Sequence, residues 1–169
     1  VTVERCDATH LESVLDKLQE CGVPVRVDGD TITVQPHGTL RAANVTTRPY
    51  PDFPTDLQAQ FMALMTRADG VSIITETVFE NRLMHVGELR RMGARIVVDG
   101  ETAIVAGPAP LSGAPVMASD LRASACLIVA GLAAEGETVI NRAYHIDRGY
   151  EKVETKFQGL GARIERISG

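Results

Sequence analysis

Arginine side chains stand at three points where the sequence predicts the start of a helix. Arg82 follows a predicted strand, and Arg122 and Arg148 each follow closely after an aspartate. Because strand-to-helix junctions line the ligand crevices of α/β sheets, we expect the three guanidinium groups on one side of a sheet. A guanidinium binds carboxylate or phosphate through two parallel hydrogen bonds. The residue types alone therefore predict a site for an anionic ligand.

Asp56 lies in the strongest local motif of the chain, the segment 51–60. Two prolines favour an extended approach, and a helix is then expected to begin at Thr55, with Thr55 and Gln58 forming a capping box. An acid in a first helical turn is most simply explained by its favourable interaction with the helix dipole. The other interpretation is a carboxylate beside free backbone N–H groups, where a ligand phosphate or hydroxyl also binds.

Four further polar or apolar residues near these points have simple structural interpretations. Asp120 is expected to open one helix, and Asp147 is a candidate N-cap of another. Met84 and His85 are interpreted as a core residue and a polar residue on a helix face, respectively. Neither is predicted to contact a ligand.

The elements that position these residues follow a repeat. Three segments, at intervals of roughly 70 residues, share the end of an amphipathic helix, a glycine and an alternating strand. The glycines are Gly22, Gly93 and Gly161, each suited to the left-handed position after a helix. Two of the three strands continue into Asp-Gly hairpin turns, at 28–29 and 99–100.

The full repeat is a βαβαββ unit, and it divides the chain into three parts. Residues 37–106 hold one complete unit, 107–169 hold most of a last unit, and 1–36 hold the second half of another. Strands that alternate with helices at this spacing predict an α/β domain. Because residues 1–3 look like the middle of a strand, we expect the chain to be part of a longer protein, and its unpaired edge to self-associate.

Composition limits the classes of partner. A net charge of −5 and 4% aromatic residues argue against a nucleic-acid surface. No apolar run approaches the roughly 20 residues of a membrane span, so no membrane contact is expected. Cys6, Cys21 and Cys126 lie far apart with no ligand spacing, which predicts reduced thiols in a cytoplasmic protein and no metal site.

Four strings, distributed along the chain, together carry a resemblance to a known family. They are Phe53–Gln60, Glu76–Arg82, Asp120–Ala125 and His145–Glu151. In order and spacing they resemble the C-terminal part of the UDP-N-acetylglucosamine enolpyruvyl transferases, over essentially the whole chain. The resemblance implies an inside-out α/β barrel of repeated units, about two and a half of them present here, in an incomplete C-terminal domain at 1–169.

The same resemblance implies a function. The family moves enolpyruvyl from phosphoenolpyruvate to the 3-hydroxyl of UDP-N-acetylglucosamine, the first committed step of peptidoglycan synthesis in the bacterial cytoplasm. This links it to cell wall biogenesis, cell shape, cell cycle and cell division. No cofactor and no metal are implied. The cleft lies between two domains, and the cysteine that acts as the family's acid belongs to the N-terminal domain, absent here, so this chain alone is expected to be inactive.

The resemblance also implies roles for individual residues. Asp56 matches the proposed base, and Thr55 and Val78 match positions that contact the UDP-sugar. Arg148 matches the arginine that engages phosphoenolpyruvate, and the other matching cleft positions are Arg82, Asp120 and Arg122. Two alternatives stay open at this point: the related 3-phosphoshikimate enolpyruvyl transferase, and a non-catalytic βα-repeat binding module.

Overall fold

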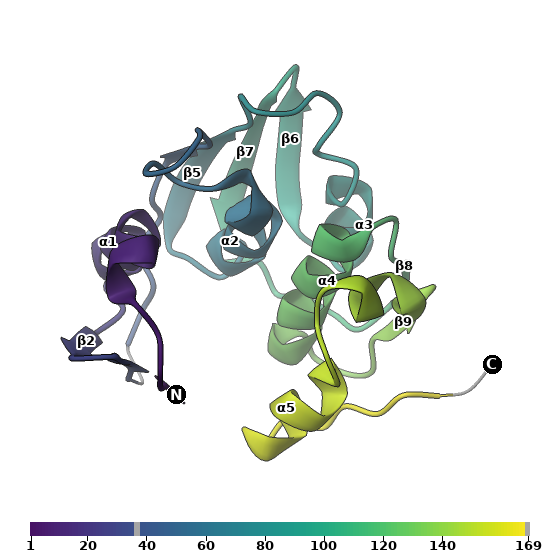
Figure 1. The fold of residues 1–169 in the computed structure, drawn as a ribbon. Coiled ribbons are helices and arrows are strands. Elements are labelled where there is room, and N and C mark those ends of the chain that lie inside the picture. The colour runs from purple at the N-terminus through teal and green to yellow at the C-terminus, as the bar shows by residue number, and fades with distance from the viewer. Residues whose placement is uncertain (36–37, 168–169) are drawn as a thin grey trace.

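The computed structural model describes residues 1–35 and 38–167, so the predicted boundary between residues 36 and 37 lies outside the described residues. The first part of the chain forms a small antiparallel sheet in the order β1-β3-β2, beside a helix. Figure 1 shows this lobe at one side of the larger sheet. Its elements are β1 (Thr2–Val3), η1 (Ala8–Leu11), α1 (Glu12–Glu20), β2 (Val25–Asp28) and β3 (Thr31–Val34).

A four-stranded sheet in the order β4-β5-β7-β6 is the centre of the molecule (Figure 1). Within this sheet β4 and β5 pair in parallel, and the other two pairs are antiparallel. Alternation along β5 buries Ser72 and Ile74 under the helices and leaves Val71 and Ile73 exposed on the other face. The elements are β4 (Val45–Thr46), η2 (Thr55–Leu57), α2 (Gln58–Met65), β5 (Gly70–Thr75), α3 (Val86–Arg91), β6 (Arg95–Asp99) and β7 (Thr102–Gly107).

The last part of the chain adds a parallel strand pair and a long apolar helix, α4, which packs on α2. The main core joins residues of both helices to the buried face of the central sheet. A smaller cluster, Ile128, Ile146 and Val153, joins α4 to the C-terminal segments. The elements are β8 (Pro115–Met117), α4 (Leu121–Ala133), β9 (Val139–Asn141), η3 (Ala143–Arg148) and α5 (Val153–Gly159). The predicted α/β class is confirmed.

The predicted glycines and hairpins are also confirmed. Gly22, Gly93 and Gly161 have φ values of 87°, 95° and 92°, the left-handed conformation that ends a helix. β2 pairs with β3 and β6 with β7 across the two Asp-Gly turns. The strand expected after Gly161 does not form, because no strand among the described residues pairs with this segment.

Helix starts were predicted less well. Asp120 is the N-cap of α4 and accepts from the N–H groups of Arg122 and Ala123, as a helix-opening aspartate should. The capping box at Thr55 is wrong, because a 3₁₀ turn precedes α2 and no side chain caps either segment. Asp147 lies inside η3 rather than at a helix start, so its predicted capping role is also wrong.

Among the described residues, no helix is long and apolar enough to cross a membrane.

Candidate active site

Three segments of the chain meet at the carboxylate of Asp56. Its Oδ1 accepts a hydrogen bond from Arg122 Nε at 2.6 Å and lies 3.3 Å from Arg82 Nη2. Asp56 comes from η2, Arg82 from the turn before α3, and Arg122 from the first turn of α4. The Asp56 side chain is 62% exposed, and the two arginine side chains are 21% and 34% exposed. The result is an open carboxylate flanked by two guanidinium groups.

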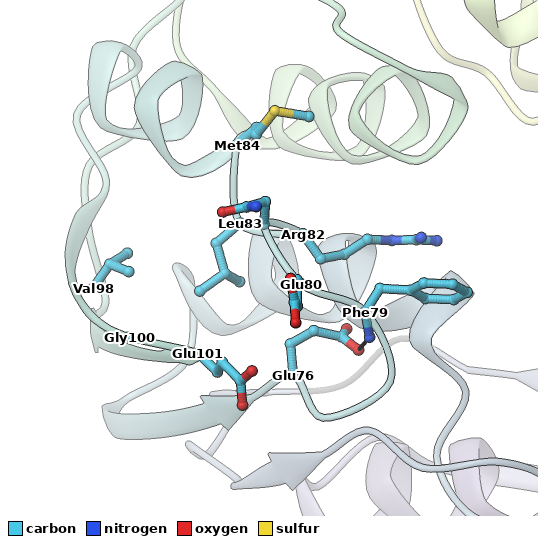
Figure 2. Close-up of a pocket in the computed structure, with 10 residues that line it drawn as sticks. Glu76, Phe79, Glu80, Arg82, Leu83, Met84, Val98, Gly100 and Glu101 are labelled. Atoms are coloured by element: carbon cyan, nitrogen blue, oxygen red, sulfur yellow. Dashed lines mark hydrogen bonds between the residues drawn. The ribbon is translucent and has the colours of Figure 1, made fainter.

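The positions of these arginines only partly match the prediction. Arg122 stands at the start of an α-helix as expected, but Arg82 lies in the turn 78–85, and α3 begins only at Val86. The Arg82 guanidinium carbon is 4.6 Å from the centre of the Phe79 ring, a cation–π contact that orients it. In Figure 2 the two side chains extend to the same side of the turn.

Asp120 sets the position of Arg122. Burial disfavours the charge of this carboxylate, but hydrogen bonds from the N–H of Ala123, the hydroxyl of Ser119 and the N–H of Arg122 outweigh burial and lower its pKa. Those same bonds commit both of its oxygens to the start of α4. Asp120 therefore acts on the site chiefly by fixing the helix that carries Arg122, and its predicted ligand contact stays a prediction.

Beneath the arginines is a small polar cavity of about 30 Å³, lined in part by Thr55, Gln58, His85 and Asp120. Both amide atoms of Gln58 and the Nε2 of His85 are buried without a hydrogen-bond partner among the described residues. A site of this size and polarity fits about one water molecule. Burial lowers the pKa of His85 to about 4, so the imidazole is neutral at neutral pH.

The interpretation of Met84 and His85 from the sequence was wrong for both. Met84 is 63% exposed and His85 is 4% exposed. The turn 78–85 replaces the first helical turn that we expected, so the side chains before α3 do not follow a helical period. His85 is instead buried and lines the small cavity together with Asp120.

The sequence reasoning missed Glu76, which is 1% exposed. Its Oε1 accepts from the hydroxyl of Thr47 and from the N–H groups of Val78 and Phe79, and its Oε2 accepts from the hydroxyl of Thr55. The period-2 pattern of β5 could have found it, because continuing the buried positions by two residues reaches Glu76. Through these hydrogen bonds, the Glu76 carboxylate links the turn that contains Val78 to the segment that contains Asp56.

Arg148 does not join this cluster. It is exposed at the end of η3, and no hydrogen bond or ion pair between described residues links it to Asp56 or the other arginines. Its segment is fixed by neighbours instead. Arg166 donates to both carboxylate oxygens of Asp147, at 2.7 and 2.9 Å, and Gln60 donates to the Tyr150 hydroxyl at 3.3 Å.

A second, larger cavity of about 520 Å³ lies on the other side of the turn 78–85, against the β6–β7 hairpin (Figure 2). Carboxylates from Glu80 and Glu101 line it together with the apolar side chains of Leu83 and Val98. Arg82 lines both cavities, but Asp56 and Arg122 do not line this one.

The cysteines take no part in the cluster. Cys21 and Cys126 are fully buried, and burial raises the pKa of both thiols. The Cys6 thiol donates to the carbonyls of Val3 and Asp30 within the first sheet. Within 1–35 and 38–167, no group of three or more His, Cys, Asp or Glu side chains could hold a metal ion.

The fold and this cluster define the class. Residues 1–157 match the family of EPSP synthase (3-phosphoshikimate 1-carboxyvinyltransferase), and the chain belongs to that family. It superimposes with a TM-score of 0.87 and 34% identity on the crystal structure of the enolpyruvyl transferase NikO from Streptomyces tendae, covering 94% of this chain and 37% of that one. The fold is therefore that of the enolpyruvyl transferases.

Particular relatives share a more specific name. The chain is 57% identical over 165 residues to a UDP-N-acetylglucosamine 1-carboxyvinyltransferase from Koribacter versatilis, covering 98% of this chain and 38% of that protein. It is 61% identical over 160 residues to the protein of the same name from Rhodopseudomonas palustris, covering 94% and 37%. The chain thus spans less than half the length of these relatives.

Proposed function

We propose that this chain forms part of a bacterial enzyme that transfers enolpyruvyl from phosphoenolpyruvate to the 3-hydroxyl of UDP-N-acetylglucosamine. The observation that carries the proposal is the meeting of Asp56, Arg82 and Arg122 from three separate segments. High identity to relatives that bear this enzyme's name supports it. The activity places the protein in peptidoglycan synthesis, in the cytoplasm, and so in cell wall biogenesis, cell shape and the cell cycle.

In the proposed reaction Asp56 is the base. It takes the proton of the sugar hydroxyl as the hydroxyl oxygen bonds to C2 of phosphoenolpyruvate and C3 gains a proton. The tetrahedral adduct then loses a proton from C3 and expels phosphate from C2, which gives the enolpyruvyl ether. Asp56 is suited to the first step because its side chain is open to a ligand while two guanidinium groups fix its orientation.

The arginines supply charge for the anionic co-substrate. Arg82 and Arg122 already flank the carboxylate that would meet the sugar, and each retains N–H groups that can turn to a carboxylate or phosphate. Arg148 is proposed to engage phosphoenolpyruvate from η3. Thr55 and Val78 are proposed to contact the UDP-sugar.

Replacing one oxygen of Asp56 tests the proposal. In the full-length protein, Asp56→Asn should leave folding intact and slow turnover by about 10²–10⁴, because the amide cannot accept the hydroxyl proton. Asp52→Asn is the matched control, since Asp52 is exposed four residues earlier and makes no ion pair with a described residue. Turnover is followed as phosphate release. Near-normal turnover of the Asp56 variant would overturn its proposed role as the base.

A further inference from the structure

The carboxyl group of Glu76 accepts hydrogen bonds from four donors. The Thr47 hydroxyl and the Val78 N–H donate to Oε1 at 2.8 and 2.9 Å. The Phe79 N–H donates to the same oxygen at 3.2 Å, the hydrogen bond drawn in Figure 2. The Thr55 hydroxyl lies 2.8 Å from Oε2. Two of the donors are backbone N–H groups that cannot reverse, so Oε1 must be an acceptor. A buried carboxyl surrounded in this way is stabilised as an acceptor-only carboxylate.

An acceptor-only carboxylate fixes the direction of both hydroxyl bonds. A threonine hydroxyl has one proton and two lone pairs, so a hydroxyl that donates to Glu76 can only accept from any other partner. Thr47 shows this arrangement completed within the protein. Its hydroxyl donates to Glu76 and accepts from the N–H of Thr77 at 3.0 Å.

The Thr55 hydroxyl donates to Glu76 as that of Thr47 does, but it lacks the second bond, in which the hydroxyl accepts. No described residue donates to it in return. Thr55 is only partly buried and lines the small cavity beneath Arg82 and Arg122, next to Asp56. Its free lone pairs are therefore available at the candidate active site.

We infer that Glu76 is a positioning residue that makes the Thr55 hydroxyl an obligate acceptor, so that this point of the site selects a ligand bearing a hydrogen-bond donor. The inference rests on the proposed function for the identity of that ligand. An amino sugar offers hydroxyl and amide N–H donors, whereas the carboxylate and phosphate of phosphoenolpyruvate offer acceptors. Thr55 thus favours the UDP-sugar at this point and disfavours phosphoenolpyruvate there.

Glu76→Gln in the full-length enzyme tests the direction of the bond. The Gln oxygen can keep the three donors that Oε1 binds, which places the amide NH₂ opposite Thr55 and makes it donate to the hydroxyl. The hydroxyl proton then turns toward the ligand, where it meets another donor. We expect the Kd of UDP-N-acetylglucosamine to rise about tenfold or more, with the KM of phosphoenolpyruvate unchanged.

Two threonine variants separate this effect from a general loss of structure around Glu76. Thr55→Val removes the acceptor, so adding Glu76→Gln to it should weaken sugar binding no further. Thr47→Val removes the other hydroxyl from the same carboxylate and should leave the Kd of the sugar unchanged, because Thr47 is fully buried. Additive effects of the Glu76 and Thr55 changes, or an equal loss with Thr47→Val, would overturn the inference.

A measurement on the wild-type protein without ligand tests the inference even if the variants fail to fold. The carboxyl-carbon NMR signal of Glu76, assigned in the wild-type protein through the carbons of its own side chain, should report a carboxylate. A protonated Glu76 would carry its proton on Oε2 and donate to Thr55, which reverses the polarity and overturns the inference. A wild-type enzyme that does not bind the UDP-sugar would overturn the proposed function, while the NMR signal still decides the direction of the Glu76–Thr55 bond.

Discussion

At the residue scale, the ion pairs of Asp56 position groups more than they stabilise the fold. Asp56 is more than half exposed, and exposed pairs of this kind contribute about 0–1 kcal/mol each. The arginines that reach it are held by other contacts, Arg82 by the Phe79 ring and Arg122 by the start of α4. The carboxylate is therefore held by groups whose own positions are set independently of it.

His85 should make folding stability depend on pH. Its pKa falls from 6.5 in the unfolded chain to about 4 in the folded protein, so below pH 6.5 the unfolded state binds a proton that the folded state does not. Stability is complete above pH 6.5 and is lost as the pH falls toward 4. A shift of this size corresponds to roughly 3 kcal/mol, of which about 2 kcal/mol should be lost by pH 5.

Urea unfolding of the wild type and of His85→Gln at pH 7.5 and pH 5 checks this. The free energy of unfolding of the wild type should fall more between the two pH values than that of the variant. Because all other titrating groups are shared, the difference between the two slopes belongs to His85. Parallel pH dependences would show that the imidazole is not held neutral by burial.

Arg148 is predicted to act on phosphoenolpyruvate by geometry rather than by charge. In the full-length enzyme, Arg148→Lys keeps the charge but loses the forked pair of donors, so the KM of phosphoenolpyruvate should rise and turnover should fall by about 10- to 150-fold. Binding of the UDP-sugar should not change. Steady-state kinetics with each substrate varied in turn would show this.

The competing explanation for Arg148 is a simple surface ion pair. Among the described residues it makes no pair with Glu151 or any other acid, which weighs against that explanation. A silent Arg148→Lys substitution would nevertheless remove Arg148 from the site.

Residue types predicted part of this site before the fold was known. The three arginines Arg82, Arg122 and Arg148 were expected on one side of a sheet, and two of them converge while Arg148 does not join them. Asp56, the residue they converge on, was grouped with them only through the family resemblance. The alternation along β5 could have predicted that Glu76 is buried, but no spacing along one segment encodes its four hydrogen-bond partners from three segments. Met84 and His85 differ from their expected exposure for a local reason, because a turn replaced the expected first turn of the helix.

At the scale of elements, two kinds of local pattern predicted structure correctly, the Asp-Gly turns and the glycines after helices. Both depend on neighbouring residues only and formed as expected, whereas the alternating strand expected after Gly161 does not form among the described residues. The capping box failed because the Thr55 hydroxyl bonds instead to Glu76, a residue 21 positions away. Long-range hydrogen bonds of this kind override local preference.

The end of β7 should tolerate no side chain at Gly107. A Cβ there would lie 2.2 Å from the carbonyl oxygen of Ala68, with two more backbone oxygens near it. Because all three atoms belong to the backbone, relieving the clash requires the main chain to move. Gly107→Ala should lower the free energy of unfolding by about 2–4 kcal/mol. Thermal or urea unfolding measures the change.

Gly87 supplies the matched control. It lies in α3 with open space around it and an ordinary helical φ, so alanine there should raise stability by roughly 0.5 kcal/mol through helix propensity. Equal effects of the two Gly→Ala changes would contradict the close contact between β7 and the loop after α2.

At the scale of the whole molecule, we propose that this chain supplies one wall of a site. The cluster around Asp56 is open, and the relatives that match are more than twice as long as the chain. The proposed chemistry needs an acid for C3, and two of the three cysteines here are fully buried. The third, Cys6, lies between β1 and η1, and its thiol donates to the carbonyl of Asp30. We therefore predict that the 169-residue chain by itself releases no phosphate from the two substrates above the level of a protein-free control.

The most direct test of the account is phosphate release from phosphoenolpyruvate by the full-length protein, offered UDP-N-acetylglucosamine or 3-phosphoshikimate as the acceptor. Identity to relatives named for the nucleotide-sugar reaction predicts turnover with UDP-N-acetylglucosamine alone, and formation of its enolpyruvyl ether in equal amount to phosphate. Turnover with 3-phosphoshikimate in its place would assign the site to the related enzyme. No turnover with either acceptor, from a folded full-length protein, would contradict a catalytic role for the Asp56 cluster.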